Sequence, residues 1–125
     1  MRYFLSIGSN IEPKKNIDFA KKELALILSN INTSSTYRTK AVGFEGDDFL
    51  NLVVAGDCSL NFEALKSKLK KIEDLSGRNR NAPKFSERTL DIDIVLQIDQ
   101  NDDILFESEE INKYSFVSEP LKELF

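Results

Sequence analysis

The sequence contains no histidine and only one cysteine among its 125 residues. The missing histidine excludes Ser-His and Cys-His catalysis and any metal site built on imidazole, so oxygen ligands must hold any metal ion. Hard cations such as Mg²⁺ suit oxygen ligands best. A single cysteine, Cys58, excludes an internal disulfide and favours a reducing compartment. Because Cys58 lies near the apolar pair Val53 and Val54, we expect it to be a packed side chain rather than a nucleophile.

Long apolar runs are absent as well, since none approaches the roughly 20 residues that a membrane-spanning helix needs. The first residues become polar too soon for a signal peptide and are more typical of a strand. The length predicts one domain over residues 1–125, because it suffices for a single core and not for two. We therefore expect a cytoplasmic protein without a membrane partner. Nothing in the sequence indicates a subunit interface, so a monomer is expected.

The net charge of −4 hides a separation of the two signs along the chain. Residues 65–88 contain eight basic and three acidic side chains, whereas residues 99–125 contain eight acidic side chains and two lysines. An acidic protein with one basic segment is not typical of a general nucleic-acid binder. Its basic segment is compatible with one compact anion, such as a polyphosphate.

Hydrophobic patterning predicts four strands, over residues 2–7, 33–37, 49–55 and 90–96. Two apolar stripes at spacings of three and four indicate two helices: Ile17, Ala20, Leu24 and Leu28 in the first, and Phe62, Leu65, Leu69, Ile72 and Leu75 in the second. The order βαββαβ predicts an α+β, ferredoxin-like fold with both helices on one face of an antiparallel sheet.

The helix ends carry their own signals. Pro13 suits the first turn of the first helix. Asn61 can cap the second helix, and Gly77 can end it. The acidic tail is expected to end in a short helix or turn, docked by the apolar residues of segment 120–125.

Asp91 and Asp93 are the first candidates for chemistry. Residues two apart on a strand point to the same face, with Cα atoms roughly 6.6 Å apart. Two such carboxylates can share one or two Mg²⁺ ions. A solvated strand face is the competing interpretation, and the pair alone favours it.

The basic segment before this pair changes the balance. Arg78, Arg80, Lys84 and Arg88 all precede Asp91 within a short stretch. Phosphoryl transfer requires positioning and charge neutralisation, by metal on one side and by arginine or lysine on the other. Alone, the loop is equally compatible with a solvated turn or a nucleic-acid contact. Together with the aspartates it predicts a site for phosphate and metal.

Asn51 interrupts the apolar run of its predicted strand. A buried amide without partners costs on the order of 1–3 kcal/mol, so Asn51 needs hydrogen bonds. It can serve a strand edge or read the polar edge of a flat heterocycle, on which Phe49 and Phe116 can stack. No Walker A motif is present. Gly8-Ser9-Asn10 is a weak phosphate-loop signal, and a plain turn is the better interpretation.

The sequence resembles the 6-hydroxymethyl-7,8-dihydropterin pyrophosphokinase family of folate biosynthesis, nearly from end to end. The resemblance rests on Ile7-Gly8-Ser9-Asn10, residues 35–39 (STYRT), Asp48-Phe49-Leu50-Asn51, Ile72-Glu73 with Gly77-Arg78, and residues 88–94 (RTLDIDI). The last string is the most specific. The resemblance implies an ATP-dependent diphosphokinase that transfers diphosphate to the hydroxymethyl group of the pterin and releases AMP.

The resemblance also implies roles for individual residues. Asp91 and Asp93 are implied as ligands of two Mg²⁺ ions, and Arg78 and Arg88 as the further catalytic residues that engage the phosphates of ATP. The other implied nucleotide contacts are Glu73, Arg80, Lys84 and Ile94. The implied pterin pocket consists of Thr39, Val42, Phe49, Asn51 and Phe116. The loops at 40–48 and 79–87 are implied to close over the substrates.

The segment facing the nucleotide departs from the family pattern. Ser108 stands at the position of a usual histidine, and Tyr114 at that of a frequent arginine. Acidic residues occupy much of this segment, which is expected to weaken the binding of ATP phosphates.

Two other functions stay open at the level of the sequence. One is a pterin- or nucleotide-binding relative with weak or no catalysis. The other is an RNA-contacting ferredoxin-like module that uses the basic segment 78–88. Its strand aromatics do not follow the pattern of an RNA-stacking surface and its tail is acidic, so no nucleic-acid partner is expected.

Overall fold

The computed structural model describes residues 1–78 and 88–125. Arg80, Lys84 and the loop 79–87, to which the sequence assigned roles, lie outside the described residues. No helix in the described part is both long and apolar enough to cross a membrane.

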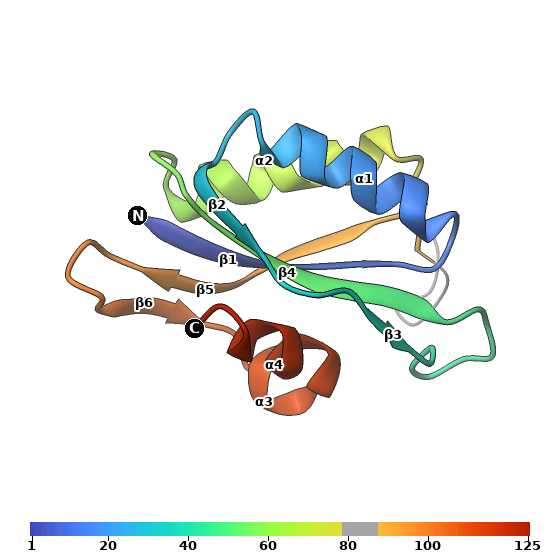
Figure 1. Ribbon diagram of the computed structural model, residues 1–125. Helices are drawn as coiled ribbons and strands as arrows, with labels where there is room; N and C mark the ends of the chain where they lie inside the picture. The colour runs from blue at the N-terminus through green and yellow to red at the C-terminus, as the bar shows by residue number, and fades with distance from the viewer. Residues whose placement is uncertain (79–87) are drawn as a thin grey trace.

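A six-stranded antiparallel sheet forms the centre of the molecule (Figure 1). Its strand order is β2-β4-β1-β5-β6, and the short strand β3 also pairs with β4. The strand bounds are β1 Arg2–Ser9, β2 Ser29–Thr33, β3 Tyr37–Thr39, β4 Phe49–Asp57, β5 Asp91–Ile98 and β6 Ile104–Glu107. The three central strands, β4, β1 and β5, are almost entirely buried.

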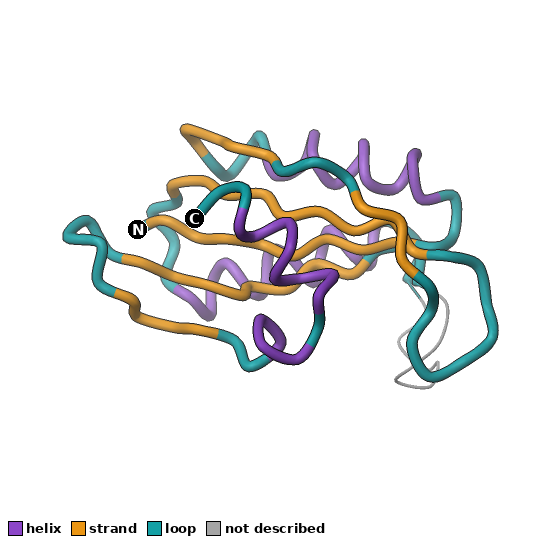
Figure 2. The backbone as a smooth tube through the Cα atoms, turned by 60° about the horizontal axis from the view of Figure 1, so that its bottom comes forward, coloured by secondary structure: helices purple, strands orange, loops and turns teal. Residues whose placement is uncertain are grey.

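Helices cover both faces of this sheet. α1 (Pro13–Leu24) and α2 (Phe62–Leu75) lie on one face, and α3 (Glu110–Lys113) and α4 (Ser115–Lys122) lie on the other (Figures 1 and 2). The predicted ferredoxin-like βαββαβ arrangement is confirmed, with both of its helices on one face. Strand β6 and helix α3 were not predicted, and α4 is the short helix expected in the tail.

Strand alternation assigns side chains to two separate cores. Under α1 and α2, the odd residues of β1 pack with the even residues of β4 and β5, including Leu5, Leu52 and Ile92. On the opposite face, Phe4, Val53 and Leu96 pack with Val117 and Leu121 of α4. The sheet is therefore sandwiched between two apolar layers over part of its length.

A β-bulge interrupts the alternation of β5. Phe4 pairs with Leu96 and Leu5 pairs with Ile94, so Val95 has no partner on β1. An extra residue of this kind shifts the phase of the side chains that follow it. As a result Val95 and Leu96, neighbours in sequence, both belong to the core beneath α4.

The region predicted as one strand over 33–37 is divided in the structure. β2 ends at Thr33 and β3 begins at Tyr37. Between them Ser34 replaces the regular pairing, because its hydroxyl accepts a hydrogen bond from the N–H of Val53 (2.9 Å) while its own N–H donates to the Val53 carbonyl (2.9 Å). Because the Ser34 side chain bonds to the neighbouring backbone, the regular strand pairing is interrupted here without leaving the backbone N–H of Val53 unpaired.

Leu75 does not belong to the apolar stripe of α2, contrary to the sequence prediction. It is 69% exposed, whereas Leu65, Leu69, Ile72 and Glu73 are buried. At 3.6 residues per turn, Leu75 points about 100° away from the centre of that buried face. In the first helix, Leu28 lies beyond the end of α1, but it is buried as predicted.

The predicted helix-end signals are confirmed. Pro13 occupies the first turn of α1. The side chain of Asn61 accepts a hydrogen bond from the N–H of Ala64 at 2.9 Å, which caps α2. Gly77 adopts a φ of +90° immediately after the C-cap Ser76, in the left-handed region that glycine enters without steric cost.

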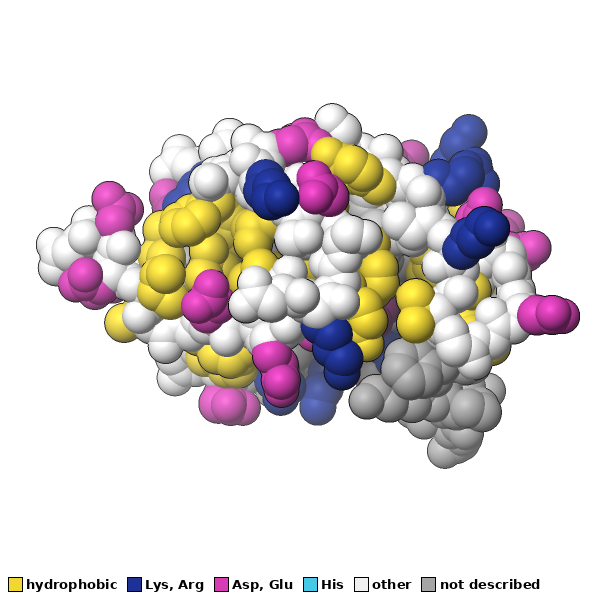
Figure 3. All heavy atoms as spheres, turned by 90° about the horizontal axis from the view of Figure 1, so that it is seen from below, with side chains coloured by type: hydrophobic (Ala, Val, Ile, Leu, Met, Phe, Trp, Pro, Cys, Tyr) yellow, Lys and Arg dark blue, Asp and Glu magenta, His cyan; other side chains and the backbone are white. Residues whose placement is uncertain are grey.

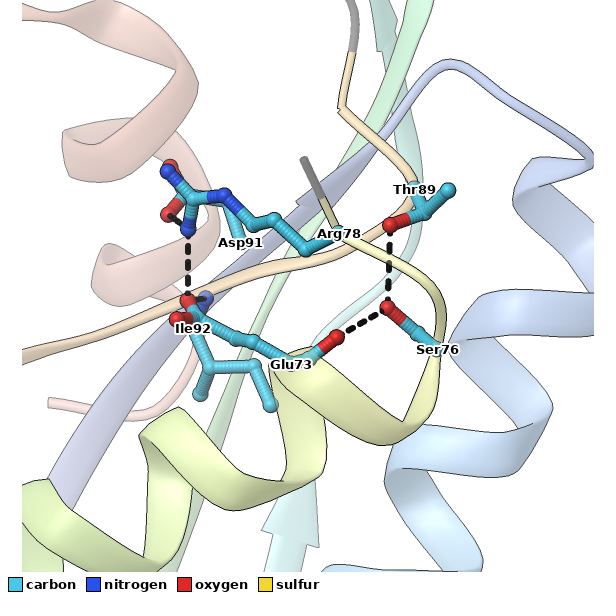
Figure 4. Close-up of polar contacts among 6 residues, drawn as sticks. All are labelled: Glu73, Ser76, Arg78, Thr89, Asp91 and Ile92. Carbon is cyan, nitrogen blue, oxygen red and sulfur yellow. Dashed lines mark hydrogen bonds and ion pairs between the residues drawn. The ribbon is translucent and has the colours of Figure 1, made fainter. Parts of the chain in front are cut away.

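Glu73 joins the last turn of α2 to β5. Its side chain is 4% exposed. Its Oε2 accepts a hydrogen bond from the N–H of Ile92 at 2.7 Å and lies 3.0 Å from Nη1 of Arg78 (Figure 4). Because carboxylate hydrogen bonds to backbone N–H groups are charge-assisted, this contact fixes α2 against the strand that carries the aspartate pair.

The conformation of Gly77 predicts the effect of its replacement. A Cβ at this position has nothing within 4 Å, so Gly77→Ala tests backbone strain alone. We expect a loss of about 1 kcal/mol in the free energy of unfolding, measured by urea denaturation followed by circular dichroism. Gly77→Asn is the matched variant, because asparagine tolerates the left-handed region, and it should lose less. Equal stability of Gly77→Ala and wild type would contradict the interpretation.

Glu73→Ala is expected to lower the free energy of unfolding by about 3 kcal/mol, since it removes the acceptor of a buried N–H and a carboxylate partner of Arg78. Glu63→Ala is the matched control on the same helix, because Glu63 is an exposed carboxylate of the first turn. It should cost a few tenths of a kcal/mol. The same urea denaturation measures both variants, and equal losses would contradict the anchoring role of Glu73.

Candidate active site

A cavity of about 430 Å³ opens on the sheet face that carries α3 and α4. Viewed from that side, apolar side chains are exposed among acidic and basic ones (Figure 3). Nine residues predicted from the sequence line this cavity: Thr39, Val42, Phe49, Asn51, Arg78, Arg88, Asp91, Asp93 and Phe116. They come from the β3 region, β4, the ends of the segment 78–88, β5 and α4, so the fold gathers residues that are distant in sequence.

The cavity occupies the polar half of this sheet face. Toward α4 the three central strands present the apolar side chains Phe4, Val53, Ala55, Leu96 and Ile98. On the same face, further along each strand, they present Ser6, Gly8, Asn51, Asp91 and Asp93, which line the cavity. One face of the sheet is thus a floor for α4 at one end and a polar site at the other.

Asp91 and Asp93 lie on the same face of β5, as their spacing predicts. Asp91 pairs with Gly8 of β1 and Asp93 with Ser6. Burial, and then the negative charge of Asp91, raise the pKa of Asp93 to about 8. Glu110 and Glu73 act in the same direction, and Arg78 opposes them. A second negative charge beside Asp91 is therefore unfavourable in the protein alone, and a bound cation would favour the ionised form of both carboxyl groups.

Arg78 is held between two carboxylates. Its Nη1 lies 3.0 Å from Oε2 of Glu73 and 3.0 Å from Oδ1 of Asp91 (Figure 4). The Nε of Arg78 is buried and has no hydrogen-bond partner in the described part of the protein. A guanidinium fixed at one end and unsatisfied at another is prepared to donate to a further anion.

Arg88 lies close enough to this group for the charges to interact. Its pKa is lowered by burial and by the positive charge of Arg78, while Asp91, Glu73 and Asp93 oppose the change. Two arginines and three carboxyl groups thus meet at the start of β5.

The end of β1 and the residue that follows it, Asn10, position Arg88. Oδ1 of Asn10 accepts a hydrogen bond from the N–H of Arg88 (2.8 Å), and the Arg88 carbonyl accepts one from the N–H of Asn10 (3.0 Å). The Ser9 hydroxyl donates to the carbonyl of Thr89 at 2.6 Å. Ser9 and Asn10 are almost fully buried. Their polar atoms bind the protein itself, which argues against a phosphate loop, and Gly8 and Ser9 belong to β1 rather than to the predicted turn.

Asn51 has the polar partner that its apolar strand required. It is 5% exposed, and its Nδ2 donates to Oγ1 of Thr39 at 2.6 Å. Gly8, on the neighbouring strand, leaves room for this amide, because a Cβ on Gly8 would lie 2.8 Å from Oδ1 of Asn51. The pair presents a fixed polar edge at the cavity wall.

Aromatic rings complete the wall. Phe49 packs edge-on against Phe44, with 6.5 Å between ring centroids and 88° between ring planes. Phe116 is stacked with Tyr114, at 4.7 Å and 17°. The rings of Phe49 and Phe116 thus have orientations fixed by a neighbouring ring.

Two of the predicted residues do not line the cavity. The side chain of Ile94 packs in the core beneath α1 and α2 and is 8% exposed. Glu73 lies behind Arg78 and acts on the cavity through it. Arg80 and Lys84 cannot be placed, since they lie outside the described residues.

Sequence reasoning assigned no individual role to several further lining residues, among them Ser6, Lys40, Phe44, Glu109, Glu110, Lys113 and Val117. Lys40 and Phe44 belong to the loop 40–48, which is expected to close over the site. Their position in this loop was the sequence feature that could have identified them. Glu109 is the N-cap residue of α3, and Glu110 and Lys113 belong to this helix, which the sequence pattern of the acidic tail did not predict. Nζ of Lys113 lies 5.7 Å from the ring centroid of Tyr114, within the range of a cation–π contact.

Sequence comparison finds related proteins. The chain is 32% identical to the folate synthesis bifunctional protein of Chlamydia caviae over 126 residues, which cover 90% of this chain and 28% of that protein. It is 36% identical to the 2-amino-4-hydroxy-6-hydroxymethyldihydropteridine pyrophosphokinase of Aquifex aeolicus over 99 residues, which cover 78% of this chain and 61% of that protein. The chain thus spans less than two thirds of the length of both relatives.

A family model covers nearly the whole chain. The model described as 7,8-dihydro-6-hydroxymethylpterin-pyrophosphokinase (HPPK) matches residues 4–125, which include every described residue that lines the cavity. The chain belongs to the 7,8-dihydro-6-hydroxymethylpterin-pyrophosphokinase family.

Proposed function

We propose that the chain transfers the diphosphate of ATP to the hydroxymethyl group of 6-hydroxymethyl-7,8-dihydropterin, within folate biosynthesis. The observation that carries this proposal is one cavity, inside the region matched by the family, that combines an aspartate pair, two arginines and an aromatic wall. The pterin hydroxymethyl oxygen attacks the β-phosphorus of ATP and loses its proton. The bond between the β-phosphorus and the α–β bridging oxygen breaks, and AMP leaves.

The aspartate pair is the proposed magnesium site. Its donors are the carboxylate oxygens that Mg²⁺ prefers, and burial beside a second carboxylate makes Asp93 costly to ionise without a cation. Within residues 1–78 and 88–125, no three acidic, thiol or imidazole side chains are grouped to hold one metal ion. Phosphate oxygens and water would therefore have to supply the remaining ligands. When bound, two Mg²⁺ ions would offset the phosphate charge and bring the reacting groups together.

The two arginines supply positive charge on the other side of the transferred group. Arg78 is oriented by Glu73 and Asp91, and Arg88 is held by Asn10. Pre-oriented donors stabilise charge in the transition state without reorganising during the reaction. Contacts of Arg80, Lys84 and Ile94 with ATP stay predictions from the resemblance.

The Thr39–Asn51 pair and the aromatic wall form the proposed pterin pocket. A flat heterocycle with polar edges suits a site that offers amide and hydroxyl groups beside ring faces. Thr39 and Asn51 would read the polar edge, while Phe49 and Phe116 would contact the ring. Val42, which is 42% exposed on the loop after β3, would cover it. A single domain, a monomeric state and a cytoplasmic location stay predictions from the sequence.

A binding relative with weak catalysis is the second candidate. It is favoured by Glu109 and Glu110, which line the same cavity as the aspartate pair. Negative side chains near a triphosphate oppose its binding. Measurement of turnover separates the two candidates.

Asp93→Asn tests the catalytic role of the aspartate pair. The substitution keeps the size of the side chain and removes its charge, so we expect AMP formation from ATP and the pterin to fall at least about 1,000-fold, while the domain stays folded by circular dichroism. Removal of Mg²⁺ by EDTA should abolish AMP formation by the wild type.

Asp102→Asn is the matched control for this change. Asp102 is an exposed acid between β5 and β6 with a φ of +65°, which asparagine also tolerates. It should form AMP at the wild-type rate. Substantial AMP formation by Asp93→Asn would refute the proposed role.

Gly8→Ala is expected to weaken pterin binding at least about 10-fold, because its Cβ would displace the Asn51 amide from Thr39. Titration calorimetry with the pterin, in the presence of Mg²⁺ and a non-hydrolysable ATP analogue, measures the change. Gly56→Ala is the control in the same sheet, since its Cβ would meet Leu28 at 2.9 Å, away from the cavity. It should lower stability and spare pterin affinity. Loss of pterin affinity in Gly56→Ala but not in Gly8→Ala would contradict the assignment of Asn51 and Thr39 to the pterin pocket.

A further inference from the structure

Glu123 accepts three hydrogen bonds from the segment that leads into β3. Its Oε1 accepts from the backbone N–H of Ser35 (2.8 Å) and from the Ser35 hydroxyl (2.9 Å). Its Oε2 accepts from the hydroxyl of Tyr37. Glu123 directly follows α4, so one carboxylate links two segments that lie almost a whole chain apart in sequence.

β3, the strand that Glu123 holds, is short. It contains three residues, and among the described residues it pairs with β4 alone. Tyr37 pairs with Asn51 and Thr39 pairs with Phe49. The residues of β3 and their partners therefore include three members of the proposed pterin pocket: Thr39, Phe49 and Asn51.

The helix before Glu123 carries another wall of the same pocket. Val117 and Leu121 anchor α4 on β4, while Phe116 of this helix lines the cavity. The carboxylate of Glu123 thus connects the wall that contains Thr39 with the wall that contains Phe116.

The charges of the two partners agree with a charge-assisted contact. The pKa of Glu123 is lowered, chiefly by the hydrogen bond from the Ser35 backbone and then by that from Tyr37. The pKa of Tyr37 is raised, chiefly by its hydrogen bond to Glu123. Neighbouring Lys122 pairs with Glu119 at 3.3 Å, so its ammonium group is directed to a different carboxylate.

We propose that Glu123 is a positioning residue of the pterin site, because its hydrogen bonds to Ser35 and Tyr37 fix β3 relative to α4. This inference rests on the proposed function, since it explains how the two walls of the proposed pterin pocket are held at a fixed separation. Glu123 does not line the cavity, so it acts through Thr39 and its partner Asn51. The nucleotide and metal positions lie on β5 and beside it, and they do not depend on this contact.

Glu123→Ala separates the two substrates. The dissociation constant of the pterin, measured by calorimetry, should rise about 10-fold, because the two walls of the pocket are no longer held in place before the pterin binds. The dissociation constant of a non-hydrolysable ATP analogue should stay within twofold of the wild-type value. Loss of affinity for both ligands would indicate general destabilisation and overturn the proposal.

Glu119→Ala is the matched control, because Glu119 is an exposed carboxylate on the same helix that pairs with Lys122 and acts on Tyr37 through its charge alone, as the weakest of the causes that raise the Tyr37 pKa. It should leave pterin affinity unchanged. Glu123→Gln keeps an acceptor for Ser35 without the charge and should fall between wild type and Glu123→Ala. Tyr37→Phe should weaken binding less in the Glu123→Ala background than in the wild type, because its acceptor is already gone. Additive losses would overturn the proposal.

Hydrogen exchange provides a readout that needs no ligand. In Glu123→Ala, the backbone amides of residues 37–39 should exchange at least about 10-fold faster, while those that pair β1 with β5 stay as protected as in the wild type. Unchanged exchange at 37–39 would overturn the proposal. Absence of pterin binding by the wild type would instead refute the proposed function. Wild-type binding with equal affinity in Glu123→Ala would refute the positioning role alone.

Discussion

The carboxylate of Glu73 is buried where the last turn of α2 meets β5, and the charged side of the cavity is arranged around it. It accepts the N–H of Ile92, the residue between the two aspartates, and it orients Arg78, which in turn contacts Asp91. A buried carboxylate is tolerated only when its partners satisfy it, so helix, strand and guanidinium are fixed together. The geometry of the aspartate pair thus depends on a residue that does not line the cavity.

The cavity brings several negatively charged side chains together at a partly buried site. Asp91 and Asp93 lie together on a half-buried surface, with Glu109 and Glu110 on the same cavity wall. Arg78 and Arg88 offset part of this charge, although each also opposes the other. Such an arrangement is costly for the isolated domain and favourable once cations and phosphates enter. The two apolar cores on either side of the sheet supply the stability that this local cost requires.

Local sequence patterns correctly predicted those features that depend on a single helix or strand. Strand alternation predicted that Asp91 and Asp93 lie on one face. The polar residue Asn51 within an apolar strand correctly predicted a hydrogen-bond partner. The tail was harder to predict, because β6 and α3 are short and largely exposed and leave a weak hydrophobic period.

Contacts between distant segments were beyond the reach of the sequence. The anchoring of Ile92 by Glu73 and the cavity position of Lys113 both depend on how elements meet in space. The role of Ile94 at the nucleotide site was implied by the resemblance alone, and its side chain packs in the core under α1 and α2.

The bulge at Val95 divides β5 into two segments of opposite phase. Before it, the residues toward α4 are Asp91 and Asp93; after it, Leu96 and Ile98 take that direction, while Gln97 turns to the other face and meets the hydroxyl of Tyr3. Without the extra residue, uninterrupted alternation would direct Gln97 into the apolar floor beneath α4. Because of this one inserted residue, the two halves of β5 follow separate alternation patterns. Substitutions among the polar residues before the bulge therefore leave unchanged the apolar residues after it, on which α4 packs.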